Sequence, residues 1–179
     1  LIGCTADKAE DSASARVEVD PLDWPVGEVG PYGVGYRSFD WSYSPGVDFA
    51  DRTIRINLWY PTEDTEGPEA AYTVGIDSGA IEDAALADSV YSGGHPVHVH
   101  SHGYRGYGAT SAFLARYFAS HGIVTVAPDH TNNTLIDHSD PLGAAHYFHR
   151  PLDIRAALDA LEAEGGPMNR AMVMLSGHS

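Results

Sequence analysis

The stretch from Ala171 to Ser179 reads AMVMLSGHS, and it decides how the rest of the chain is interpreted. Ala171 to Leu175 is a short apolar run, a pattern typical of a strand buried on both faces of a sheet. The run leads through Gly177 and His178 to Ser179. A strand followed by G-x-S is the first half of the nucleophile elbow G-x-S-x-G, in which a serine lies on a sharp strand-to-helix turn. Gly and Ser also form ordinary turns, so this interpretation requires that the preceding sequence contain the other strands of such a sheet.

The second half of the chain alternates between strand and helix patterns. Strands are predicted over Pro96 to Ser101 and Ile123 to Ala127, before the final apolar run. A helix is predicted over Gly108 to Ser120, with Gly122 as its C′ residue. A second helix is predicted to begin at Pro151 and to end at Gly165-Gly166. Strands separated by helices with short connections predict βαβ units and a parallel sheet. The apolar residues expected to face the sheet are Phe113, Leu114, Tyr117 and Phe118 in the first helix, and Ile154, Leu158 and Leu161 in the second.

The first half of the chain predicts an antiparallel hairpin. Val34 to Tyr43 carries four aromatic residues, and Thr53 to Tyr60 alternates apolar and polar positions. Pro45-Gly46 lies between these two runs, where a turn is expected. The remaining segments are predicted as loops over Pro21 to Tyr32, Pro61 to Asp77 and Asp129 to Leu142, and as a short helix over Ile81 to Val90.

The composition sets the broad class of the protein. The chain has 179 residues, enough for one domain or part of one, and a hydrophobic content of 43% supports a core. Its formal charge is −15, with Lys8 as the single lysine against nine arginines. This charge argues against nucleic acid or an anionic membrane surface as a partner, because both attract clustered cations. A well-solvated acidic surface, a halophilic setting or an extracellular one would each account for it.

The beginning of the chain resembles a bacterial lipobox. Leu1-Ile2-Gly3-Cys4 contains the only cysteine, so no intrachain disulfide can form. The polar, small residues that follow are typical of a tether. We therefore expect residues 1–20 to be a lipobox-like start and disordered tether, and residues 21–179 to belong to one domain. An exported protein, possibly attached to the cell envelope through a lipidated Cys4, is expected, with a cytoplasmic protein as the alternative.

The segment Pro96 to Thr134, PVHVHSHGYRGYGATSAFLARYFASHGIVTVAPDHTNNT, resembles the α/β-hydrolases, in particular bacterial dienelactone hydrolases and platelet-activating-factor acetylhydrolases. In that group one strand ends in S-H-G, a helix ends in A-S-H-G and a further strand ends in A-P-D-H. Arg150 to Leu161, RPLDIRAALDAL, resembles the helix before the nucleophile strand, and Asn57 to Pro61, NLWYP, resembles the end of the second strand. The resemblance implies a three-layer α/β-hydrolase fold, mostly parallel with an N-terminal antiparallel hairpin, from about Val34 to Ser179.

The resemblance also implies roles for residues at the strand ends. Ser179 matches the nucleophile that attacks an ester carbonyl, and Tyr104 matches a residue whose backbone N–H lines the oxyanion hole. The residues that support these two groups are His102, Gly103, Gly177 and His178. The implied activity is that of a serine esterase, lipase-like, which acts on small-molecule or lipid esters through an acyl-enzyme and needs no metal or organic cofactor.

In this fold the catalytic carboxylate and histidine follow the serine along the chain. The resemblance therefore implies that none of the ten histidines is the catalytic one, that the C-terminal part of the domain is missing from this sequence, and that this segment alone is inactive. It also implies that Met172 to Leu175 form an open sheet edge, because the nucleophile strand is central in the family. An apolar edge strand invites aggregation.

Two other functions stay open at this point. His95, His98, His100 and His102 alternate along one predicted strand, so a metal-dependent hydrolase must be considered. A non-catalytic hydrolase-like surface protein is the second alternative, and Ser179 counts against it. Asp129 and His130 are adjacent on an extended segment, where side chains point apart, so they do not suggest a catalytic pair.

Overall fold

The computed structural model describes residues 21–73, 75–141 and 143–179. The expected lipobox with Cys4 and the expected tether lie outside the described residues, so lipidation and the boundary at residue 20 stay predictions. None of the helices in the described ranges is both long enough and apolar enough to cross a membrane.

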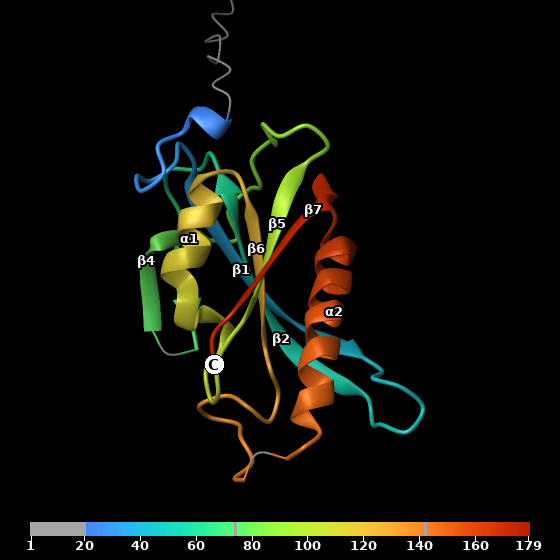
Figure 1. Cartoon of the computed structure of the whole chain (residues 1–179). Helices are drawn as coiled ribbons and strands as arrows, with labels where there is room; N and C mark the ends of the chain where they lie inside the picture. Colours follow the sequence, from blue (N-terminus) through green and yellow to red (C-terminus); the bar gives the residue numbers. More distant parts are fainter. Residues whose placement is uncertain (1–20, 74, 142) are drawn as a thin grey trace, which may run out of the picture.

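The described residues form a mixed sheet of seven strands in the order β3-β4-β1-β2-β6-β5-β7 (Figure 1). Strands β6, β5 and β7 run parallel to one another, and β2 pairs antiparallel with both β1 and β6. The predicted combination of an N-terminal antiparallel hairpin with a parallel sheet is confirmed. The strands are β1 (Gly33–Tyr43), β2 (Arg52–Thr62), β3 (Glu69–Tyr72), β4 (Gly75–Glu82), β5 (His95–Ser101), β6 (Val124–Asp129) and β7 (Met168–Gly177).

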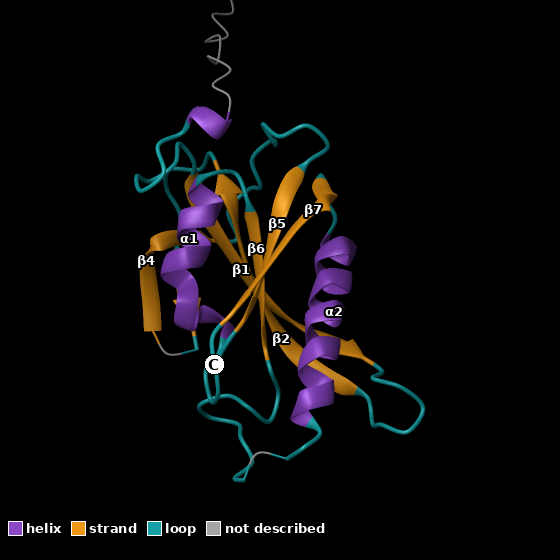
Figure 2. Ribbon diagram, in the orientation of Figure 1, coloured by secondary structure: helices purple, strands orange, loops and turns teal. Residues whose placement is uncertain are grey.

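Two α-helices cover opposite faces of the sheet, which gives three layers (Figure 2). Successive residues of a strand point to opposite faces, and β2 shows this directly. Ile56 packs in one core cluster with Ala156 and Ala160, whereas Trp59 packs in another with Ala119. The helices are α1 (Ala112–Ser120) and α2 (His146–Glu164), and the short 3-10 helices are η1 (Pro21–Asp23) and η2 (Gly108–Ser111).

The predicted hairpin is the longest pairing of the sheet. Gly33 pairs with Thr62 and Tyr43 with Arg52, without a register shift between them. The predicted inward face of β2 is confirmed, because Ile54 and Ile56 are fully buried and Leu58 is 4% exposed. The other face of β2 is also covered along its second half, because α1 packs against it. β2 pairs with β1 on one side and β6 on the other, so it lies inside the sheet and both of its faces are covered there.

Two predictions for residues 61–90 are wrong. The loop predicted over Pro61 to Asp77 contains β3 and the beginning of β4, and the helix predicted over Ile81 to Val90 is absent from this described segment. β3 has four residues, and β4 carries glycines at its first and fifth positions, so neither shows a strand pattern of its own. Both strands form because β4 pairs with β1 at Gly35 and Tyr36, and β3 pairs with β4.

Both predicted helices form, but with differences. In α1 the small side chains of Ala115 and Ala119 face the sheet, while Phe113 is 69% exposed. Small residues allow the helix to approach the sheet closely, so the predicted aromatic face is only partly right. Helix α2 begins at His146, five residues before Pro151. Pro151 therefore lies in the second turn and not in the first, and it removes one N–H from the helical ladder.

The apolar run Ala171 to Leu175 lies in β7, but its predicted burial on both faces is wrong. β7 is a terminal strand of the sheet, and Met172 and Leu175 are 46% and 69% exposed. The open edge implied by the resemblance is thus what the described residues show. The pairing of β7 with β5 is parallel, as predicted.

Candidate active site

The carboxyl ends of β5, β6 and β7 meet at one end of the sheet, where the C mark lies in Figure 1. In open parallel sheets this end is where ligands bind. Beyond the last residue of β7, the backbone N–H of His178 donates to the carbonyl of Ser101 at 3.0 Å. Ser179 follows this hydrogen bond directly, so its position is tied to the end of β5.

Gly103 explains how the loop after β5 comes so close to Ser179. A Cβ atom at position 103 would lie 3.2 Å from the backbone carbonyl carbon and oxygen of Ser179 and 2.6 Å from His178 Nδ1. A side chain at this position would therefore push the end of β7 away. The structure brings Gly103, His178 and Ser179 together at this end of the sheet.

The loop from Gly103 to Gly106 presents the backbone of Tyr104. The N–H of Gly106 donates to the Gly103 carbonyl at 3.0 Å, and the N–H of Arg105 donates to Asn133 Oδ1 at 3.0 Å. Arg105 has a φ of 55°, a conformation that persists in a non-glycine residue only where its surroundings impose it. Within the described part of the chain, the N–H of Tyr104 makes no hydrogen bond. It is therefore a free donor beside Ser179.

His102 lies beneath this loop and is fully buried. Its Nδ1 is 2.7 Å from the carbonyl of Gly103, and its Nε2 accepts a hydrogen bond of 2.9 Å from the backbone N–H of His130. Burial, together with the nearby His130, lowers the pKa of His102 to about 3. The ring is therefore neutral at pH 7, and it supports the loop without facing the solvent.

The other histidines of the predicted cluster are also engaged in hydrogen bonds. Both ring nitrogens of His95 face backbone carbonyls, those of Gly122 and Ala87. His98 and His100 share the hydroxyl of Ser176 at 2.8 and 2.9 Å. Burial and the charge of His100 lower the pKa of His98 to about 4. In the described ranges no three His, Cys, Asp or Glu side chains converge as a metal site would require.

A cavity of about 400 Å³ opens beside Ser179. Its lining includes Tyr104, so the free backbone donor and the serine border the same space. Sequence reasoning missed most of this lining, because its members come from loops and from the start of α2, far from Ser179 along the chain. The residues that line the cavity are Tyr104, Asn133, His146, Tyr147, Arg150, His178 and Ser179.

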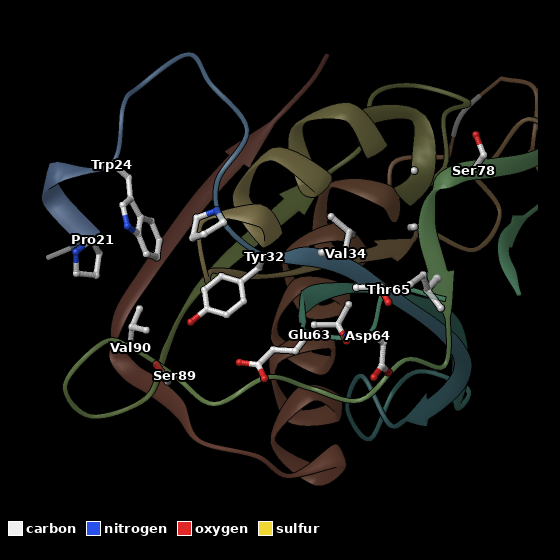
Figure 3. A pocket seen from close by; sticks show the side chains of 16 residues that line it. Pro21, Trp24, Tyr32, Val34, Glu63, Asp64, Thr65, Ser78, Ser89 and Val90 are labelled. Atoms are coloured by element: carbon white, nitrogen blue, oxygen red, sulfur yellow. The ribbon is translucent and has the colours of Figure 1, made fainter. Parts of the chain in front are cut away.

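A larger hollow of about 1450 Å³ lies at the opposite end of the sheet (Figure 3). Trp24 and Tyr32 form part of its wall, together with Glu63 and Asp64 after β2. It borders the amino-terminal end of β1 and the segment before β5. None of the residues of the motifs at the strand ends lines it, so the smaller cavity is the candidate active site.

The sequence matches no known protein-family profile and no curated protein sequence. Among solved structures, it is similar to a ferulic acid esterase from Streptomyces cinnamoneus, with 21% identity and a TM-score of 0.69 over 88% of this chain and 54% of that chain. An acetyl xylan esterase from Paenibacillus sp. R4 gives 19% identity and a TM-score of 0.48 over 87% of this chain and 43% of that chain. A dienelactone hydrolase from Klebsiella pneumoniae subsp. pneumoniae gives 12% identity and a TM-score of 0.35, over 78% and 49%.

The likeness to the ferulic acid esterase is the one that bears on the fold. The chain spans about half the length of that structure. Together with the strand order and the two helix layers, it identifies an α/β-hydrolase fold, as the sequence motifs implied.

Proposed function

We propose that this chain forms part of a serine hydrolase that acts on carboxylic esters through an acyl-enzyme at Ser179. The observation that carries the proposal is the contact of Gly103 with the backbone of Ser179, because it brings the free N–H of Tyr104 and the serine to one cavity. The similarity to the ferulic acid esterase structure supports the same reaction class. The substrate is a small-molecule or lipid ester.

The roles of the groups follow from acyl transfer. The hydroxyl of Ser179 attacks the ester carbonyl as its proton passes to the general base, and the Tyr104 N–H donates to the oxyanion that develops on the former carbonyl oxygen. The ester C–O bond then breaks, the alcohol leaves with the proton from the base, and the acyl-enzyme remains for hydrolysis by water. One such donor contributes about 2.7–4 kcal/mol of transition-state stabilisation. We propose that the general base and its carboxylate follow Ser179 in the full-length protein, as is usual for this fold.

The experiment is labelling of the full-length protein with a fluorophosphonate probe, followed by mapping of the modified peptide. The proposal predicts modification at Ser179 and none in a Ser179→Ala variant. A folded wild-type protein that takes up no probe would instead support a non-catalytic surface protein. A stoichiometric metal in purified protein, lost together with activity on chelation, would support the metal-dependent alternative.

We propose that the protein is exported and that lipidated Cys4 tethers it to the cell envelope. Mass spectrometry of protein from its native membrane fraction would test this, and an unmodified Cys4 in such a sample would contradict it.

A further inference from the structure

Asp153 in α2 is fully buried and accepts four hydrogen bonds. Arg52 of β2 donates to both carboxylate oxygens, at 2.7 and 3.0 Å. The hydroxyl of Tyr43 donates to Oδ1 at 2.7 Å, and His130 Nδ1 lies 2.8 Å from Oδ2. Burial alone would raise the pKa of Asp153, but the hydrogen bonds from His130, Arg52 and Tyr43 outweigh it and hold this pKa below its usual value. The carboxylate is therefore charged, and its four acceptor sites are filled.

The proton positions along this chain of contacts can be assigned. Because the Asp153 carboxylate can only accept, His130 Nδ1 must carry a proton. Burial lowers the pKa of His130, so the ring is neutral and its Nε2 is an acceptor. The hydroxyl of Ser101, 2.9 Å away, then donates to this nitrogen. Arg150 Nη2 in turn donates to the oxygen of Ser101 at 2.9 Å.

The network extends from Ser101 to the next two residues of the chain, His102 and Gly103. The backbone N–H of His130 donates to His102 Nε2, so the ring proton of His102 is on Nδ1 and is donated to the carbonyl of Gly103. Arg150 also donates to the carbonyl of His102. The rings of His102 and His130 lie 4.7 Å apart. His130 and Arg150 thus bind polar groups of Ser101 and His102, and His102 in turn binds the carbonyl of Gly103.

Ser101 connects this network to the nucleophile. Its side chain binds His130 and Arg150, while its carbonyl accepts the hydrogen bond from the N–H of His178, the residue before Ser179. The amino-terminal part of α2 lies at the same end of the sheet (Figure 1). We propose that the buried chain Arg52–Asp153–His130 positions the active site, by fixing Ser101 and His102 so that the Tyr104 N–H and the Ser179 hydroxyl keep their mutual placement. This proposal rests on the ester hydrolase function proposed above.

Ser101, His130 and Asp153 have the residue types of a catalytic triad, but their surroundings assign them a positioning role. The His130 ring is fully buried, and Ser101 is not among the residues that line the cavity beside Ser179. The charge of Asp153 is already paired with Arg52, and the side chains of Asp153 and Arg52 are 0% and 7% exposed. A carboxylate neutralised in this way has little charge left to stabilise an imidazolium. These groups are therefore suited to holding the backbone and not to proton transfer.

The test compares two His130 variants of the full-length protein with one control variant. His130→Leu removes the contacts with Ser101 and Asp153 and retains an apolar side chain, and His130→Asn is the conservative replacement. Val124→Ala is the matched control, because Val124 is equally buried but lies at the other end of β6. Hydrogen–deuterium exchange of residues 101–106 and steady-state hydrolysis of p-nitrophenyl acetate are measured for each variant, with thermal unfolding as a check of folding.

The proposal predicts that His130→Leu raises the exchange rate of residues 101–106 at least tenfold and lowers kcat at least tenfold, with KM changed less than threefold. His130→Asn is expected to recover part of both effects, and Val124→Ala to show neither. Unchanged exchange in a folded His130→Leu protein would overturn the proposal. If wild-type Ser179 takes up no fluorophosphonate, the hydrolase function fails by itself, and the exchange measurement still decides the positioning role.

Discussion

Replacement of Asp153 by Asn removes one charge from the centre of the buried network and turns one of its two acceptor oxygens into an amide donor. Asparagine has nearly the same volume and can still accept from Tyr43, but it leaves the Arg52 guanidinium, whose side chain is 7% exposed, without a counter-ion. Breaking a buried ion pair by removing one partner costs about 3–5 kcal/mol of unfolding free energy. We expect a loss of this size at pH 7, measured by urea denaturation of the full-length protein.

The pH dependence of this stability difference tests whether it comes from the charge of Asp153. The folded-state pKa of Asp153 is below its value in the unfolded chain, so its contribution is fully present above about pH 3.9 and is lost as the pH falls through the folded-state pKa. The difference between wild type and Asp153→Asn should therefore shrink below about pH 4. Asp159→Asn, at an exposed position of the same helix, should change stability by less than about 0.5 kcal/mol. A difference in unfolding free energy between wild type and Asp153→Asn that is below 1 kcal/mol at pH 7, or that persists undiminished at pH 3, would refute the reasoning.

Three further substitutions test other contacts. Gly103→Ala should lower kcat/KM for p-nitrophenyl acetate at least tenfold, because the new Cβ would lie too close to His178 and Ser179. Gly143→Ala should leave kcat/KM unchanged, because a Cβ at position 143 has no atom within 4 Å. Ser176→Ala leaves His98 and His100 without their shared hydroxyl, so the unfolding free energy measured by urea denaturation should fall by about 1–3 kcal/mol. Ser42→Ala at the surface is the control, and an equal loss in both variants would contradict this prediction. Val173→Lys on the exposed edge strand should slow aggregation of the 179-residue chain in light scattering, and an unchanged rate would show that β7 is not the aggregating surface.

The parallel half of the sheet could be predicted because each of its strands has its own signal. β6 is a short apolar strand that ends at Pro128-Asp129, and β7 ends in the G-x-S motif. The histidines in β5 did not prevent this, because the two ring nitrogens of His98 bind the hydroxyls of Thr125 and Ser176 on the neighbouring strands. β3 and β4 could not be predicted in the same way, because they become strands only through pairing with β1.

The candidate site was predictable where it depends on local motifs and not where it depends on contacts across the fold. Gly103 and Ser179 end two motifs that the sequence shows directly. Arg52 and Asp153 are separated by 101 positions, and their pairing follows from the way α2 packs beside β2 and β6. The prediction that Asp129 and His130 point apart is confirmed: Asp129 binds Asn57 and Gly108, whereas the His130 ring binds Ser101 and Asp153.

The most direct measurement of the central claim is the position of the acyl group during turnover. The full-length protein would be mixed with p-nitrophenyl acetate, quenched in acid within the first turnovers, digested and analysed by mass spectrometry. Our account predicts one acetyl group per molecule, on the peptide that contains Ser179, and none there in Ser179→Ala. An acetyl group on Ser101 instead, or turnover without any acetylated serine, would contradict it.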